Sequence, residues 1–225
     1  TPKPSSAASD VYKRQVNRHA EVLAQLGFPI KLDETALLPK PSLTQDVADI
    51  AGSDNAIRIG IAPFAQHQGK VYPEDLLQEV IDKLAVRENT RIFLFGGSKD
   101  EAKKLKKMAN DRDNFEVIAG GRLALKQELQ LIANLNLMLS MDSANGHMAA
   151  MFGVPVVTLW GATHPYSGFV PYNQPLSNSL MADREQYPLL PTSVYGNKVV
   201  PGYEDAMRTI TPKMVLNKID ELLLS

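Results

Sequence analysis

The sequence contains no cysteine, few aromatic residues and almost no net charge. Among its 225 residues there are no Cys, one Trp and four His, and 25 acidic residues nearly balance 24 basic ones. Without Cys, disulfides and thiolate metal sites are excluded, and the composition fits a reducing compartment. A net charge of −1 provides no basic face, which argues against a nucleic-acid-binding protein.

Long hydrophobic runs are also missing. No stretch approaches the roughly 18 apolar residues that a transmembrane helix needs, so we expect no transmembrane segment. The first residues lack the apolar segment of a signal peptide. Hydrophobic residues nevertheless make up 44% of the chain, which is enough for a sizeable core.

The chain divides into three segments by composition. Residues 1–15 are small and polar without periodicity, which predicts a disordered tail. Apolar residues at helical spacing predict a helix from Val16 that ends at Gly27, followed by an extended stretch rich in Pro. We interpret 16–50 as a helix and hinge linker, and 51–225 as one ligand-binding domain.

Apolar runs alternate with amphipathic segments from residue 57 onward. The runs that predict strands lie at 57–62, 90–95 and 115–118, with two more inside 135–165. Five segments predict helices. One begins near Pro73, one has Ser98 as its N-cap, one covers 126–134, one lies around His147, and one begins at Thr211-Pro212. Short loops between alternating strands and helices predict an α/β fold with a doubly wound parallel sheet. The stretch 166–205, rich in Pro, Tyr and Asn, predicts a long surface loop.

Polar residues follow the predicted strands at their carboxyl ends, where open parallel sheets bind ligands. The loop from Pro63 to Lys70 is suited to a phosphate with Lys70 as the counter-charge; the alternative is a solvated lysine. Asp100 or Glu101, after Gly96-Gly97, is suited to a ribose diol; the alternative is an acid favoured by the helix dipole. No G-x-G-x-x-G motif is present, which argues against an NAD domain.

Asp142 and His147 form the most informative pair. A helix that begins near Ser143 offers free N–H groups to an anion, and His147 lies about one turn inside it. No second ligand is spaced from His147 as a metal site requires, so we expect no metal. Thr163 follows the next strand and is suited to a phosphate or a sugar hydroxyl; the alternative is a turn residue. The other side chains of this region, expected in the core, are Met148, Met151, Phe152 and Trp160.

These residues resemble glycosyltransferase family 9, the ADP-heptose:lipopolysaccharide heptosyltransferase family. The motifs that carry the resemblance all follow predicted strands or the turns between them. They are Gly60-Ile61-Ala62-Pro63 with Lys70 and Tyr72-Pro73; Phe95-Gly96-Gly97; Gly121-Arg122; Asp142-Ser143 with His147-Met148-Ala149-Ala150; Pro155; and Gly161-x-Thr163-x-Pro165. The family usually has Gly after the Asp-Ser or Asp-Thr pair, where this chain has Ala144.

The resemblance implies the C-terminal, Rossmann-like half of a two-lobed GT-B enzyme. It implies that Lys70, Ala65 and Gln66 meet the donor diphosphate, that Glu101 holds the ribose, and that Arg122 and Leu123 border the adenine. It also implies contacts to the sugar and diphosphate from Asp142, Ser143, Ala144, His147 and Thr163. The donor would be a nucleotide-diphosphate sugar such as ADP-heptose, used without a metal or other cofactor.

The resemblance further implies an inverting enzyme of lipopolysaccharide biosynthesis, located in the cytoplasm or peripherally at the inner membrane. The family's catalytic base and its acceptor site, for a lipopolysaccharide core, belong to an N-terminal lobe that these residues do not match. We therefore expect this chain to bind a nucleotide sugar but to transfer nothing alone. Two other interpretations stay open: a lobe of a nucleotide-sugar epimerase, and a non-catalytic nucleotide-binding module.

Overall fold

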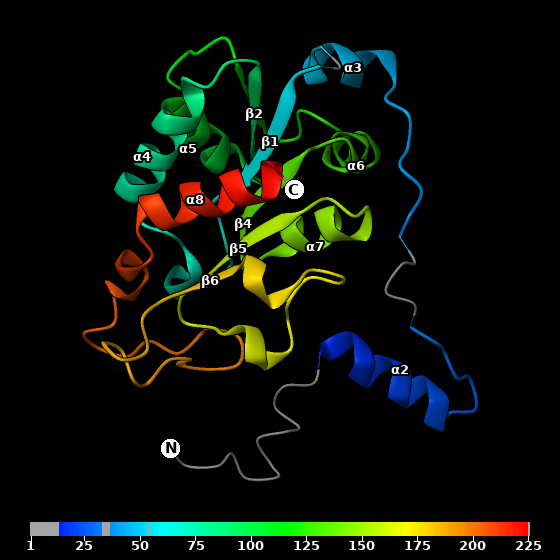
Figure 1. Ribbon diagram of the computed structural model, residues 1–225, viewed down its shortest axis with the longest axis vertical. Helices are drawn as coiled ribbons and strands as arrows, with labels where there is room; N and C mark the ends of the chain where they lie inside the picture. Colours follow the sequence, from blue (N-terminus) through cyan, green and yellow to red (C-terminus); the bar gives the residue numbers. More distant parts are fainter. Residues whose placement is uncertain (1–13, 33–36, 54, 225) are drawn as a thin grey trace.

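The computed structural model describes residues 14–32, 37–53 and 55–224. The predicted tail therefore lies outside the described residues except for its last two positions, and Gln15 already begins the first described helix, α2 (Gln15–Gln25). The rest of the described chain is built around one sheet, shown with its covering helices in Figure 1.

The sheet has six strands in the order β3-β2-β1-β4-β5-β6, and every neighbouring pair is parallel. The strands are β1 (Ile57–Ala62), β2 (Thr90–Phe95), β3 (Phe115–Ile118), β4 (Leu137–Met141), β5 (Val156–Trp160) and β6 (Ser179–Met181). This arrangement confirms the predicted doubly wound, Rossmann-like α/β fold. The strand order reverses between β1 and β4, which is the position where such sheets open a crevice for ligands.

Helices cover both faces of the sheet. One face carries α4 (Glu74–Ala85), α5 (Lys99–Ala109) and α8 (Pro212–Leu223), and the other carries α3 (Gln45–Ala51), α6 (Leu125–Ala133) and α7 (Ala144–Met151). Single 3-10 turns, η1 (Gln68–Lys70), η2 (Pro165–Ser167), η3 (Leu176–Asn178) and η4 (Ala206–Thr209), lie in the loops. Figure 1 shows α2 apart from these layers, joined to α3 by a long connector.

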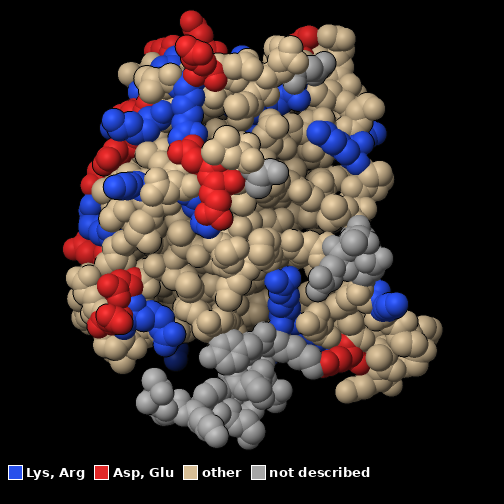
Figure 2. Space-filling model, viewed as in Figure 1, with Lys and Arg blue, Asp and Glu red and all other residues tan. Residues whose placement is uncertain are grey.

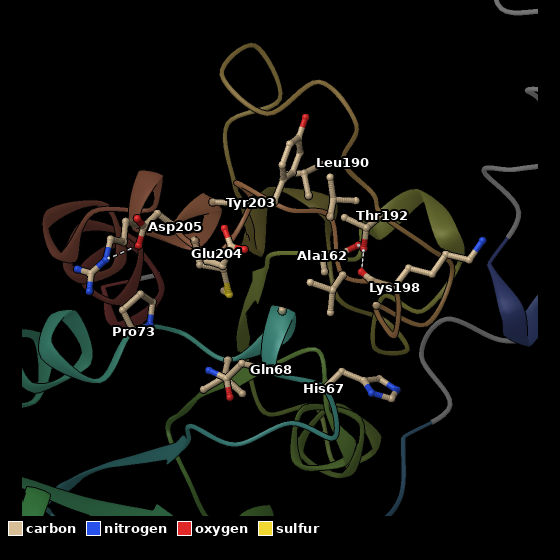
Figure 3. Close-up of a pocket in the computed structure, with 18 of the residues that line it drawn as sticks. His67, Gln68, Pro73, Ala162, Leu190, Thr192, Lys198, Tyr203, Glu204 and Asp205 are labelled. Carbon is tan, nitrogen blue, oxygen red and sulfur yellow. Dashed lines mark hydrogen bonds and ion pairs between the residues drawn. The ribbon is translucent and has the colours of Figure 1, made fainter.

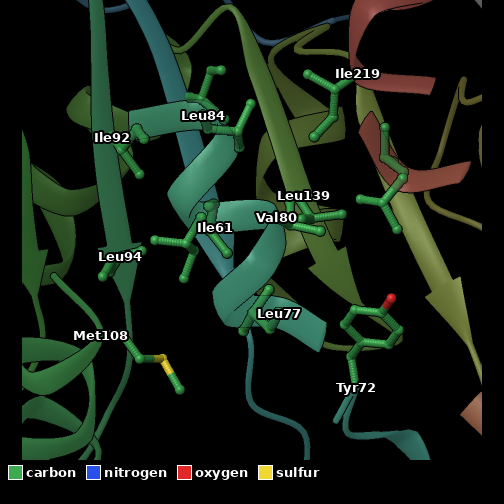
Figure 4. Packing of buried hydrophobic residues seen from close by; sticks show 14 of the residues in the cluster. Ile61, Tyr72, Leu77, Val80, Leu84, Ile92, Leu94, Met108, Leu139 and Ile219 are labelled. Atoms are coloured by element: carbon green, nitrogen blue, oxygen red, sulfur yellow. The ribbon is translucent and has the colours of Figure 1, made fainter. Parts of the chain in front are cut away.

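The larger core cluster lies between the sheet and the face of α4 and α8. Apolar side chains on one side of α4 are buried here, and Figure 4 shows Leu77, Val80 and Leu84 in one cluster with Leu139 of β4 and Ile219 of α8. Burial of this stripe against apolar strands provides the main stabilisation of the fold, at about 25 cal/mol for each Å² of apolar surface. Trp160 is buried as predicted.

Of the expected core residues on and after α7, two are only partly buried against the second core cluster and a third is exposed. Met148 and Phe152 are half-buried against it, but Met151 is 45% exposed, so its assignment to the core was wrong. The eight-residue helix α7 turns only part of its surface toward the sheet, and Met151 ends it on the outer side.

Two short elements lie where the sequence predicted none. Helix α3 falls inside the predicted linker, and burial of Val47 and Ala51 attaches it to the face of α6. Strand β6 falls inside the predicted loop and pairs with β5.

Helix α2, in contrast, has no buried residue. The backbone N–H of Gln15, at its start, donates to the carbonyl of Gly168 at 2.8 Å.

Charged side chains of both signs are mixed on the face shown in Figure 2. Blue and red side chains alternate on the left of this view, the side of α4 and α5 in Figure 1. Within the described ranges, no helix combines the length and the apolar character that crossing a bilayer requires.

Candidate functional site

A pocket of about 530 Å³ opens at the carboxyl edge of the sheet. Its walls come from the three segments that follow β1, β2 and β4, the strands around the point where the strand order reverses. The predicted site residues that line it are Ala65, Gln66, Lys70, Glu101, Asp142, Ser143, Ala144 and His147. The structure therefore brings eight residues, from three segments that are distant in sequence, to one pocket.

Lys70 and Asp142 form an ion pair at the base of this pocket. The Lys70 ammonium lies 2.7 Å from Oδ2 of Asp142, and the two side chains are only 14% and 7% exposed. The hydroxyl of Thr163 donates to the same oxygen at 2.9 Å, and Lys70 also approaches the Asp142 carbonyl oxygen at 3.4 Å. Asp142 is therefore held from two sides, and Lys70 is fixed with its charge at the pocket.

His147 lies one turn into α7 and faces the same pocket. Burial lowers the pKa of His147 below its ordinary value of 6.5; Asp142 favours the charged form, while Lys70 opposes it. The imidazole is therefore neutral near pH 7 in these surroundings, and additional negative charge nearby would favour its protonation.

The first turn of α7 has free backbone donors. Ser143 is the N-cap, but its side chain does not cap the helix; its Oγ lies 3.1 Å from Oγ of Ser140. Unpaired N–H groups at a helix N-terminus attract anions. The pocket thus combines a fixed ammonium, a protonatable imidazole and helix N–H groups on one side.

Glu101 supplies the carboxylate on the other side of the pocket. It completes a capping box with Ser98, and its Oε2 accepts from the backbone N–H groups of Gly97 at 2.6 Å and Ser98 at 3.0 Å. Ser98 is therefore an N-cap, as predicted. Asp100, the alternative acid, does not line this pocket and pairs with Lys103 at 3.0 Å.

Three predicted contact residues do not line this pocket. Arg122 pairs with Glu116 at 2.6 Å and borders a separate depression beside α5. Leu123 packs on the second core cluster, and Thr163 is buried beneath Asp142, with 1% of its surface exposed. Arg122 and Leu123 were expected from the family resemblance alone and Thr163 also from its place after a strand, and neither signal specifies the direction of a side chain.

Six further residues line the pocket, and two of these lie outside the motifs that carry the resemblance. Phe64 and Asn145 both belong to its wall. An aromatic residue two positions after a buried strand was the available signal for Phe64. Gly146, two residues after Ala144, is not among the residues that line the pocket; a β-carbon placed on it would meet Ser140 and Val156 of the sheet.

A second pocket of about 420 Å³ lies behind the turn 67–69, between that turn and the loop 190–208. Figure 3 shows its side chains, several of which are engaged with one another. Arg208 pairs with Asp205 at 3.0 Å and with Asp75 at 2.8 Å, and the Thr192 hydroxyl donates to the Lys198 carbonyl at 2.8 Å. Its polar groups thus hold the loop together. Over the residues that the structure covers, no cluster of His, Asp or Glu is arranged to hold a metal ion.

Comparison with known proteins gives a consistent result. The model of glycosyltransferase family 9 (heptosyltransferase) matches residues 5–200, a range that begins inside the predicted tail. Lipooligosaccharide heptosyltransferase 2 of Haemophilus influenzae is 27% identical over 227 aligned positions, covering 94% of this chain and 63% of that protein. Lipopolysaccharide heptosyltransferase 2 of Escherichia coli K12 is 29% identical over 173 positions, covering 74% and 47%.

Solved structures share the fold. The family 9 glycosyltransferase of Veillonella parvula has a TM-score of 0.69 at 18% identity, covering 94% of this chain and 60% of that one. The Escherichia coli heptosyltransferase WaaC, solved with ADP, has a TM-score of 0.58 at 22% identity, covering 76% and 46%. The chain thus spans between about half and two thirds of the length of these relatives. Since the family model matches most of the sequence, this chain belongs to glycosyltransferase family 9, the heptosyltransferase family.

Proposed function

We propose that this chain is the donor-binding part of a glycosyltransferase and that its pocket binds a nucleotide-diphosphate sugar such as ADP-heptose. The observation that carries the proposal is the convergence of Lys70, Glu101, Asp142 and His147 on one pocket at the carboxyl edge of the sheet. A diphosphate linked to a ribose and a sugar requires cationic groups and hydroxyl acceptors at opposite ends of one site.

The cationic end suits the diphosphate. Lys70 can bridge Asp142 and a phosphate oxygen, because an ammonium has three donors. The turn with Ala65 and Gln66, His147 and the N–H groups of α7 would complete the anion site. Asp142 and the adjoining Ser143 and Ala144 would contact the sugar.

The acidic end suits the ribose. Glu101 uses Oε2 for its own helix cap, which fixes the carboxylate and leaves Oε1 for a ribose hydroxyl. We therefore keep Glu101, and not Asp100, as the ribose ligand, and the adenine would lie beside Arg122 and Leu123, as the family resemblance implies.

The chemistry follows from where charge develops. In an inverting transfer, an acceptor hydroxyl attacks the anomeric carbon as the bond from that carbon to the diphosphate oxygen breaks. The leaving nucleoside diphosphate gains negative charge, which Lys70, a protonated His147 and the helix N–H groups would stabilise more strongly in the transition state than in the ground state. The pocket residues thus act on the leaving group and need no metal for it.

The remaining parts of the reaction belong to residues outside this chain in our proposal. The segment 16–50 would be the helix and hinge of a two-lobed enzyme, 51–225 its C-terminal lobe, and an N-terminal lobe would supply the catalytic base and the lipopolysaccharide core acceptor site. The complete enzyme would work in the cytoplasm or at the inner membrane, and the 225-residue chain alone would bind a donor without transferring its sugar.

Calorimetric titration with ADP, UDP and GDP tests the proposal. We expect ADP to bind most tightly, with a dissociation constant of the micromolar order that a charged pocket of this size supports. The matched variant Glu101→Gln should weaken ADP, whereas Asp100→Asn, at the neighbouring exposed acid, should not. A preference for UDP would favour the epimerase interpretation, and the absence of binding to all three would refute the proposal.

Protonation of His147 gives ADP binding a characteristic pH dependence. Because the pKa of His147 lies below 6.5 in the empty pocket, the phosphates of ADP should raise it, so binding takes up a proton. ADP affinity should therefore rise as the pH falls from about 8 to about 6. The gain should level off at the pH where His147 is already protonated before ADP binds. Titrations in two buffers of different ionisation enthalpy measure this proton uptake.

The matched pair for this measurement is His147→Asn and His67→Asn. His67 lies on the same loop as Lys70 but lines the second pocket, so its replacement should leave the proton uptake unchanged. The interpretation is wrong when His147→Asn binds ADP with the same pH slope as the original chain.

A further inference from the structure

The ion pair of Lys70 and Asp142 is supported from behind by a distant loop. Gly196 lies in the loop 190–208, and a β-carbon placed on it would be 3.0 Å from Cε of Lys70, 3.1 Å from Cγ of Lys70 and 2.9 Å from Cγ2 of Thr163. Its φ of +72° is one that only glycine adopts without strain. A backbone atom of this loop therefore touches both residues that hold Asp142.

The loop is fixed at this position by hydrogen bonds. The Thr192 N–H donates to the Ala162 carbonyl at 2.9 Å, and the Ala162 N–H donates to the Gly69 carbonyl at 2.8 Å. The loop, the turn after β5 and the turn before Lys70 are thus tied in series. Contacts of this closeness leave the aliphatic part of Lys70 little freedom to turn away from the pocket.

Thr163 completes the arrangement from the other side. Its methyl group meets Gly196, while its hydroxyl donates to Asp142 at 2.9 Å. Since Thr163 is 1% exposed and lies outside the pocket, it cannot act by touching a ligand. Its contacts instead fix the carboxylate that Lys70 pairs with.

We infer that Gly196 and Thr163 are positioning residues, which hold the Lys70 ammonium against Asp142 and toward the diphosphate of the donor. The inference rests on the proposed function for the identity of the ligand, but not for the position of Lys70. A lysine whose stem is held between a backbone and a buried carboxylate is preorganised for an anion, so little of the binding free energy goes into ordering it.

The test compares Gly196→Ala with Gly202→Ala. Gly202 belongs to the same loop and also has a positive φ, of +82°, but a β-carbon there would meet nothing within 4 Å. Both changes introduce the same backbone strain, and only the first presses on Lys70 and Thr163. We expect Gly196→Ala to weaken ADP about tenfold and AMP less than about threefold, because AMP lacks the second phosphate. Gly202→Ala should change neither.

Thr163 is tested by Thr163→Val and Thr163→Ser. The valine variant loses the hydroxyl that Asp142 accepts from and should reproduce the selective loss of ADP affinity, while serine keeps the hydroxyl and should restore it. Equal losses for ADP and AMP in the valine variant, or no difference between Gly196→Ala and Gly202→Ala, would overturn the inference.

Acetylation of Lys70, followed by peptide mass spectrometry, measures its position without any nucleotide. The paired and largely buried ammonium should react slowly in the original chain and faster in Gly196→Ala and Thr163→Val, but not in Gly202→Ala. If the original chain binds no ADP, the proposed function fails, and the acetylation rates still decide whether Gly196 and Thr163 position Lys70.

Discussion

Replacing Lys70 by methionine should weaken ADP binding about a hundredfold, because the proposed function makes Lys70 the fixed cation that would contact a phosphate. The same change should lower the free energy of unfolding by about 3 kcal/mol. It leaves the carboxylate of Asp142 buried without its ion-pair partner, although the hydrogen bond from Thr163 is kept. Calorimetry measures the first effect and urea unfolding the second.

A double variant separates these two effects. Lys70→Met combined with Asp142→Asn removes both charges, so the unpaired buried carboxylate disappears and most of the lost stability should return. ADP binding should stay weak, because the cation is still missing. If the double variant bound ADP as well as the original chain, Lys70 would have no direct role in the pocket.

Replacing Tyr72 by alanine should give the largest loss of stability, about 4 kcal/mol in the free energy of unfolding. Tyr72 is 1% exposed, and its ring packs in the cluster shown in Figure 4 with Leu77 of α4. Its hydroxyl donates to the carbonyl of Ile210 at 2.6 Å, just before α8. The side chain therefore fastens the loop that carries Lys70 to the start of the last helix.

Two further variants show which part of Tyr72 is responsible. Tyr72→Phe keeps the ring but leaves the Ile210 carbonyl without its donor, at a cost of about 1 kcal/mol. Tyr195→Ala, at a tyrosine that is 62% exposed, should change stability by less than about 1 kcal/mol. A loss for Tyr72→Ala no larger than that for Tyr195→Ala would show that the ring does not anchor the loop.

The sheet and the pocket edge were predictable because the responsible signals are local. Runs such as Ile57–Ala62 are apolar except for Arg58, as is typical of strands buried on both faces, and Ser98 with Glu101 forms a capping box that four residues specify. The rule that ligands bind at the carboxyl ends of parallel strands then placed Lys70 and His147 together.

The sequence did not reveal the features that tertiary contacts decide. Strand β6 has three residues, and α3 has seven; each forms because a neighbouring element pairs with it or covers it, which its own sequence does not specify. The directions of Arg122 and Thr163 likewise depend on partners, Glu116 and Asp142, that are brought near by the fold. The contact of Gly196 with Lys70 spans most of the domain and has no local signal.

The separation of Lys70 from Asp142 along the chain has a consequence for how a nucleotide would act on this protein. The two residues are 72 positions apart and meet only because β1 and β4 are neighbours in the centre of the sheet. A partly formed sheet without this pairing has no complete anion site, so it gains nothing from a bound nucleotide. The nucleotide would therefore stabilise only the fully folded protein and make its unfolding more cooperative.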